Sequence, residues 1–129
     1  MLMKLSLRFS ALFLAPALVL LSFGCSADEE KTAAQLRGRW EIKEALSNGR
    51  PTERLSSLFY VFTPDNQLIT NMAGTEQSFT YELDGNVILQ RGGGMDADYQ
   101  IVEITDSVLV LSAVINTYDF RFTLKKVAQ

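Results

Sequence analysis

The chain has 129 residues, with 12 basic and 15 acidic side chains, no histidine and a single cysteine. This length favours one domain, and 47% apolar with 21% charged residues is typical of a globular protein. Without histidine and with one cysteine, the usual zinc sites and the commonest general base are excluded, and a net charge of −3 offers no basic surface for nucleic acid. We therefore expect no enzyme, no metal and no cofactor.

Residues 1–24 have the pattern of a signal peptide. Lys4 and Arg8 precede an almost uncharged run from Phe9 to Gly24. A membrane-spanning helix needs about 20 apolar residues, whereas a signal-peptide core is shorter and follows a basic start. The pattern favours a cleaved signal over a retained anchor. The remainder would carry ten basic and fifteen acidic residues, a net charge of −5.

The only cysteine stands at the end of this segment. Leu21-Ser22-Phe23-Gly24-Cys25 resembles a bacterial lipobox, in which the cysteine is lipidated and becomes the first residue. The alternative is an ordinary signal-peptidase site at Cys25-Ser26-Ala27. A lone cysteine in a secreted chain has no disulfide partner within it, and lipidation would explain its presence. The resemblance implies that lipid on Cys25 anchors the protein to a membrane of the cell envelope.

Residues 25–35 are expected to form a flexible acidic tether between the lipid and a domain at 36–129. Ser26 stands where an inner-membrane retention signal would have aspartate, which favours the outer membrane, on its periplasmic face or at the cell surface. Asp28-Glu29-Glu30 is similar to the acidic export tag of some surface lipoproteins. The alternative is a solvated linker. The last residues before the domain, Lys31–Leu36, have room for one or two helical turns.

The domain is predicted to be all-β. Polar and apolar residues alternate without a fault in 78–83 and 117–125, and strict alternation indicates a strand with one buried face. Six further segments are candidate strands: 40–43, 58–62, 67–71, 87–91, 98–105 and 107–114.

Turn signals separate these segments. Asp84-Gly85 is a strong hairpin signal, Pro64-Asp65-Asn66 presets a turn, and most connections are short enough to join antiparallel neighbours. Only the connection at 47–57 is long. Eight such strands form either a closed barrel or a two-sheet sandwich, and sequential hairpins favour an eight-stranded antiparallel up-and-down barrel because closure removes exposed edges.

The strand starting at Gly38-x-Trp40 resembles the first strand of the lipocalins. The whole segment from Leu36 to Lys126 is similar to small bacterial lipocalin-like lipoproteins in the order and spacing of Tyr60-x-Phe62, Phe79-x-Tyr81-x-Leu83, Tyr99-x-Ile101 and Phe120-x-Phe122-x-Leu124. The resemblance implies that Gly38 and Trp40 close one end of a lipocalin-like barrel. Lipocalins cover this Trp with an arginine; Arg121 is on the polar phase of its strand, so Lys125 or Lys126 is expected to replace it.

One strand breaks the alternation. Continuing inward from Tyr99 and Ile101 would place the carboxylate of Glu103 inside the barrel, at a high desolvation cost. Either Glu103 contacts a ligand, or a β-bulge after Ile101 returns Ile104 to the interior. We predict the bulge.

The four tyrosines all fall on the apolar phase of their strands, which makes Tyr60, Tyr81, Tyr99 and Tyr118 the candidate ligand-binding residues. A tyrosine pointing inward needs a partner for its hydroxyl or contact with water. The four would line a pocket in an open lumen; alternatively they lie near the rims while aromatic rings fill the core.

Two functions follow from these alternatives. The resemblance implies a membrane-tethered protein that binds a small hydrophobic or amphipathic ligand. A solid barrel would instead use its rim loops, 47–57 and 91–98, to hold or inhibit an envelope protein partner. A cavity of about 300 Å³ or more favours the first function.

Overall fold

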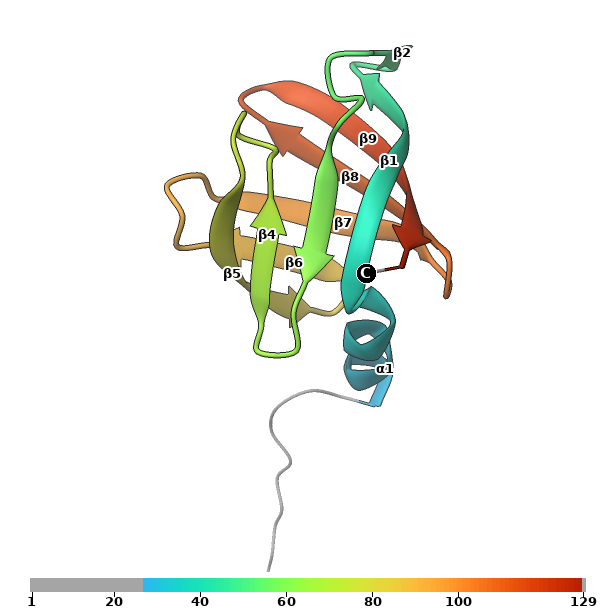
Figure 1. The fold of residues 1–129 in the computed structure, drawn as a ribbon, viewed down its shortest axis with the longest axis vertical. Coiled ribbons are helices and arrows are strands. Elements are labelled where there is room, and N and C mark those ends of the chain that lie inside the picture. The colour runs from blue at the N-terminus through green and yellow to red at the C-terminus, as the bar shows by residue number, and fades with distance from the viewer. Residues whose placement is uncertain (1–26, 129) are drawn as a thin grey trace, which may run out of the picture.

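A short helix and a closed antiparallel barrel make up the computed structural model, which describes residues 27–128 (Figure 1). The predicted signal peptide and Cys25 lie outside these residues. No helix within the described range is long and apolar enough to span a membrane. The elements are α1 (Ala27–Leu36), β1 (Gly38–Ser47), β2 (Arg50–Pro51), β3 (Phe59–Phe62), β4 (Gln67–Thr70), β5 (Gln77–Asp84), β6 (Val87–Arg91), β7 (Ala97–Ile104), β8 (Val108–Ile115) and β9 (Tyr118–Val127).

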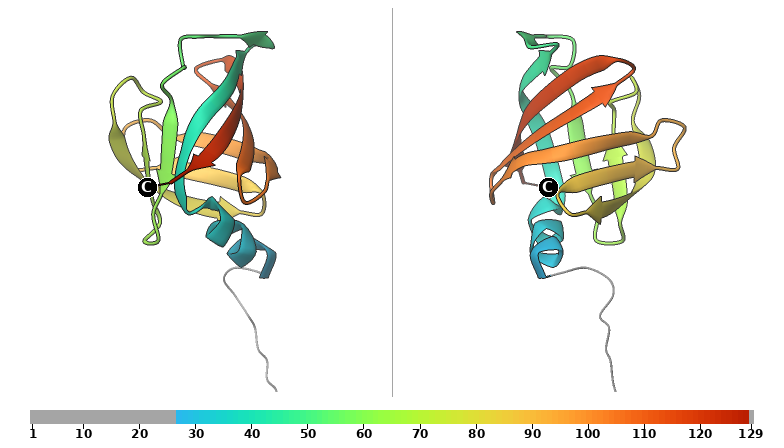
Figure 2. Two further views of the ribbon diagram at one scale, coloured as in Figure 1. Left: turned by 45° about the vertical axis from the view of Figure 1, so that its right-hand side comes forward. Right: turned by 180° about the vertical axis from the view of Figure 1, so that it is seen from behind.

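The strands pair in chain order, and β1 also pairs with β9. Eight strands, β1 and β3 to β9, therefore close into a barrel, while the two-residue β2 folds back on the end of β1. This confirms the predicted eight-stranded up-and-down barrel. Because strand direction alternates, α1 and the carboxyl terminus lie at one end of the barrel and β2 lies at the other (Figures 1 and 2). We call these the closed end and the mouth.

Alternation along the strands produces the core as expected. In β5, Phe79 and Tyr81 are buried while Thr80 and Glu82 are exposed. The predicted bulge is confirmed, since the register between β7 and β8 shifts between Ile101 and Glu103. Val102 is 45% exposed as a result, and Ile104 packs against the core.

The first strand leaves its neighbour β3 halfway along its length. The two pair only over 38–41 and 59–62. On its other side β1 pairs with β9 over residues 39–47, with a second bulge between Ile42 and Glu44, so its mouth-side half has β9 but not β3 as a neighbour. The chain at 52–58 fills the gap between β1 and β3.

That filling segment is held at both ends by backbone hydrogen bonds. Thr52 N donates to Ala45 O at 3.0 Å, and Ile42 N donates to Leu58 O at 3.1 Å. Between these points Ser56 N donates to Glu53 O, so the middle of the segment is a local turn. We refer to residues 52–58 as the strap.

The acidic segment before the barrel differs from the expected flexible tether, since residues 27–36 form α1. Asp28, Glu29 and Glu30 occupy the first turn of the helix, where negative charge interacts favourably with the helix dipole. The backbone N–H of Gly85, in the β5–β6 turn, donates to Glu29 Oε2 at 2.5 Å. At the other end of α1, Leu36 is fully buried in the core. The helix is therefore docked on the barrel.

Trp40 closes the barrel beneath this helix. Its ring is fully buried, and Nε1 donates to Leu36 O at 2.8 Å. Gly38 has φ +118°, a backbone conformation that favours glycine because it has no Cβ. The burial of Trp40 and the positive φ of Gly38 are compatible with the closing role that the resemblance implies, which stays a prediction.

Lys126 covers the Trp40 ring, in the place of the lipocalin arginine. It is the direct partner of Trp40 in the β1–β9 register, and its Nζ lies 4.7 Å from the ring centroid. The same Nζ donates to Gln35 O and Arg37 O, each at 2.8 Å. Gln35 is in the last turn of α1 and Arg37 follows the helix directly, where backbone carbonyls lack the N–H donors that a further helical turn would supply. Lys126 therefore caps the helix and also covers the tryptophan ring.

We predict that Lys126→Met destabilises the barrel. Methionine keeps the apolar stem but removes two charge-assisted hydrogen bonds and the cation–π contact, a loss of about 1–3 kcal/mol in the free energy of unfolding. Chemical denaturation measures the change. Lys125→Met, at the neighbouring exposed position, is the control and should leave stability nearly unchanged. Equal stability of the two variants would contradict this role of Lys126.

Candidate ligand-binding site at the open end of the barrel

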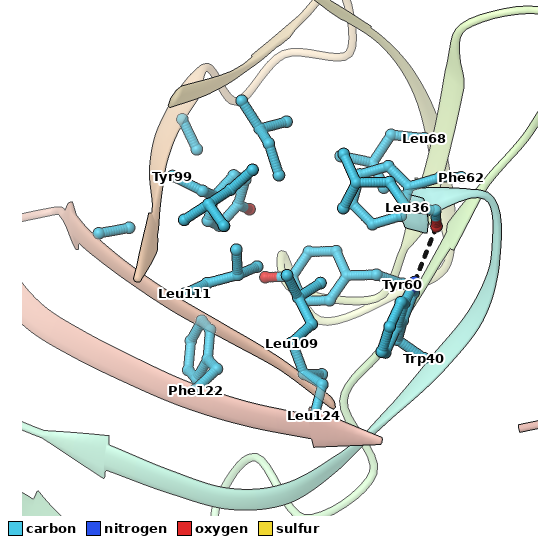
Figure 3. Packing of buried hydrophobic residues seen from close by; sticks show 14 of the residues in the cluster. Leu36, Trp40, Tyr60, Phe62, Leu68, Tyr99, Leu109, Leu111, Phe122 and Leu124 are labelled. Carbon is cyan, nitrogen blue, oxygen red and sulfur yellow. Dashed lines mark hydrogen bonds between the residues drawn. The ribbon is translucent and has the colours of Figure 1, made fainter. Parts of the chain in front are cut away.

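The closed-end half of the lumen is solid. The aromatic rings of Trp40, Tyr60, Phe62, Tyr99 and Phe122 are at most 1% exposed, and leucines complete the packing (Figure 3). Tyr60 contacts Tyr99 edge-on with ring centroids 5.5 Å apart. No ligand can enter this half without displacing core side chains.

Polar side chains cross the lumen at the top of this packing. The hydroxyl of Tyr99 donates to Gln90 Oε1 at 3.0 Å, and Gln90 Nε2 donates to Met95 O at 2.9 Å. Both side chains are fully buried. Gln90 thereby ties the β6–β7 loop to the core.

Tyr60 is the exception in this layer. Its buried hydroxyl has no hydrogen-bond partner among the described residues. Nearby Thr70, also fully buried, accepts a hydrogen bond from Met72 N at 3.2 Å and so anchors the β4–β5 loop. Burial, followed by the neighbouring Tyr99, raises the pKa of Tyr60 well above its ordinary value. Burial also raises the pKa of Tyr99 to about 12.

The structure does not bring the four candidate tyrosines together. Tyr60 and Tyr99 are in contact in the middle of the barrel. Tyr81 packs edge-on against Phe62, nearer the closed end, and burial raises its pKa. Tyr118 is 52% exposed at the mouth. The proposed tyrosine-lined pocket therefore has only Tyr118 on an open surface.

A cavity of about 510 Å³ lies at the mouth, above the polar layer. Its volume is in the range of small-molecule sites. The apolar part of its wall comes from the strap, the β4–β5 and β6–β7 loops, and the mouth ends of β8 and β9. The lining residues are Ser47, Thr52, Arg54, Leu55, Met72, Ala73, Met95, Ile115, Asn116, Tyr118 and Phe120.

A glycine fixes one side of this mouth. In the β6–β7 loop, Gly93 lies so close to Phe79 that a Cβ there would be 2.2 Å from the phenyl ring. The loop can therefore lie directly on Phe79, which leaves that ring only 2% exposed. Met95, two residues later, faces the cavity.

The polar side of the cavity contains one charged residue. Arg54 lies on the strap, and its guanidinium forms no ion pair with the described residues. The other polar lining residues, Ser47, Thr52 and Asn116, are neutral. No carboxylate lines the cavity, so Arg54 is the single charge among the described lining residues, in a chain that is acidic as a whole.

The neighbouring carboxylates of the 91–98 loop are directed away from the cavity. Arg91 Nη1 is 2.8 Å from Asp98 Oδ1, and Arg91 Nε is 3.9 Å from Asp96 Oδ2. The described residues contain no group of three or more side chains arranged to hold a metal.

Most of the cavity wall was missing from the sequence prediction. Leu55, Met72 and Met95 lie in loops, which have no periodicity to indicate the direction of a side chain. One signal was available: Asn48-Gly49 is a typical two-residue hairpin sequence. Both residues have positive φ, 52° and 81°, and this turn places the strap beside the mouth.

We predict that the buried tyrosines make the barrel labile in alkali. An unfolded tyrosine loses its proton near pH 10, whereas Tyr99 keeps it to about pH 12. The native state thus binds more protons in this interval, and the free energy of unfolding falls by about 1.4 kcal/mol per pH unit for each such group. The contribution of these protonated tyrosines to stability is complete below pH 10 and is lost progressively as the pH rises toward 12.

Tyr99→Phe tests this sign. The variant loses the hydrogen bond to Gln90, about 1 kcal/mol at every pH, but its unfolding free energy should fall less steeply between about pH 10 and pH 12. Urea unfolding across this range measures both slopes. Identical slopes for parent and variant would refute the assignment.

Comparison with known proteins supports the fold. No protein-family model and no curated protein matches the chain. Among solved structures, the chain is similar to a lipocalin-like protein from Bacteroides uniformis ATCC 8492, with a TM-score of 0.53 and 16% sequence identity over 72% of this chain and 99% of that one. At this identity the likeness extends to the fold alone. The chain therefore has a lipocalin-like barrel.

Proposed function

We propose that the protein binds a small hydrophobic or amphipathic molecule in the mouth cavity while a lipid on Cys25 tethers it to the cell envelope. The observation that carries the binding proposal is the cavity of about 510 Å³ with an apolar wall. Leu55, Met72, Met95, Ile115 and Phe120 supply that wall. A mostly apolar concavity with a few polar groups is typical of small-molecule sites.

The position of α1 supports the tether. Its first residue, Ala27, follows Cys25 by two positions, and the helix is docked at the closed end. A lipid on Cys25 would therefore attach the membrane at the end of the barrel opposite the mouth. The mouth would face the aqueous side, where a ligand or a partner can reach it. We place the lipid-anchored protein at the outer membrane, on its periplasmic face or at the cell surface.

The solid closed-end half of the lumen supports a second candidate function. A filled core with an exposed aromatic at the rim suits a module that holds another envelope protein through the loops at 47–57 and 91–98. Tyr118, half exposed beside the cavity, is the residue that such a partner would cover. Tyrosine is enriched at protein interfaces because its ring adds apolar contact area and its hydroxyl can form a hydrogen bond.

Binding of Nile red, a neutral dye that fluoresces in apolar surroundings, tests the cavity. A chain starting at Ser26 contains α1 and the whole barrel, and its cooperative melting verifies that it is folded. Ala73→Trp places an indole at the exposed edge of the cavity and should weaken dye binding by about tenfold or more, a change of 1.4 kcal/mol.

Thr75→Trp is the matched control. It lies in the same β4–β5 loop but outside the cavity lining, so it should bind dye like the parent. If the parent binds no dye, or if both variants lose binding equally, the cavity is not a ligand site and the rim-loop interaction should replace it.

Replacement of the cysteine tests the tether in the full chain. Cys25→Ala should abolish incorporation of a fatty-acid analogue and release the protein from the membrane fraction, because stable anchoring requires more than one acyl chain. Ser26→Ala, the adjacent control, should remain labelled and membrane-bound. Membrane association of Cys25→Ala equal to that of the parent would mean that a retained helix holds the protein.

A further inference from the structure

We infer that the mouth cavity selects single-chain amphipaths with an anionic head, which pairs with Arg54 while the alkyl chain enters only as far as the buried polar layer. This inference rests on the proposed binding function and adds the chemical class and the depth of the ligand. Its first support is electrostatic. Arg54 is the only charged residue among the eleven that line the cavity.

The guanidinium is available for a ligand. Arg54 has no ion pair with the described residues. Its backbone N–H, not its guanidinium, donates to Thr52 Oγ1 at 3.2 Å. By contrast, the guanidinium groups of Arg39 and Arg91 are engaged by carboxylates on the outer wall. A planar guanidinium binds carboxylate, sulfate or phosphate groups with two parallel hydrogen bonds.

The strap places the head and tail contacts side by side. Leu55 packs against the core and lines the cavity, whereas the adjacent Arg54 is exposed at the rim. The strap is fixed on the β1 side by Thr52 and on the β4 side by Asn71, whose Nδ2 donates to Ser57 O at 2.9 Å. One rigid turn therefore presents an apolar surface below a cation.

The remaining apolar lining suits a flexible alkyl chain. Met72 and Met95 contribute unbranched, polarisable side chains that adapt to different shapes. Ile115 and Phe120 give this wall its rigid part. Since these four side chains carry hydrocarbon or thioether groups, this part of the lining distinguishes chain volume and not chain functional groups.

The floor sets a limit on chain length. Tyr60, Tyr99 and Phe122 are fully buried, and the ring of Phe122 stacks on that of the lining residue Phe120 with centroids 5.4 Å apart. A chain that outgrows the cavity must leave its end in water. Each added methylene should thus improve affinity by about fourfold until the cavity is filled, and longer chains should gain nothing further.

Isothermal titration with the chain starting at Ser26 tests both parts, at concentrations below micelle formation. The probes are decanoate, decanol and decyltrimethylammonium, which share a chain and differ in the head, together with the carboxylates from hexanoate to hexadecanoate. We expect the parent to prefer decanoate, and Arg54→Gln to weaken decanoate binding by about tenfold while decanol binding stays unchanged. Arg54→Lys should retain part of the preference, since it keeps the charge but not the fork.

Arg50→Gln is the matched control, because Arg50 lies four residues away on β2, exposed, and outside the cavity lining. It should bind decanoate like the parent. If Nile red binds the parent but not Ala73→Trp, while the three heads bind equally or Arg54→Gln keeps the preference for decanoate, the anionic selectivity is wrong and the cavity remains a ligand site. Affinity that rises through hexadecanoate would overturn the depth limit. Absence of binding by every probe, Nile red included, would overturn the proposed function together with this inference.

Discussion

The contact of Lys126 with both Trp40 and the end of α1 is the constraint on which the rest of the structure depends. Trp40 on β1 and Lys126 on β9 are direct neighbours across the seam where the barrel closes. The lysine stem lies over the buried ring, and its ammonium reaches the carbonyls of Gln35 and Arg37 outside the lumen. A single side chain thus joins the closing strands to the helix that covers them.

This seal limits where the lumen can be open. Because Trp40 and Leu36 occupy the closed end, the aromatic rings above them pack on a fixed base. Contacts between rings continue without interruption from Tyr81 through Phe62, Tyr60 and Phe122 to Phe120, at centroid separations of 5.2 to 6.4 Å. Among the described residues, the cavity of about 510 Å³ lies at the mouth, where β1 has separated from β3 and loops replace strand pairing.

The sequence predicted the barrel because the strands carry their information locally. Alternation in 78–83 and 117–125 identified the inward faces, and the misplaced Glu103 identified the bulge. The docking of α1 was not predictable in the same way, because acidic residues are equally suited to a solvated linker and to the first turn of a helix. One contact that holds this segment as a docked helix comes from Gly85, which is distant in sequence. Its N–H can donate to Glu29 only after the β5–β6 turn has formed.

The candidate ligand site was harder to predict because alternation reports which face a residue occupies but not its height in the barrel. Tyr60 and Tyr118 share the inward phase, yet one is fully buried and the other is 52% exposed. Height follows from chain order, since every second connection of an up-and-down barrel lies at the same end. Tyr118 is the first residue of β9, directly after a mouth turn, so its exposure could be inferred. The direction of Leu55, Met72 and Met95 could not, because it depends on how three loops of different origin pack against one another.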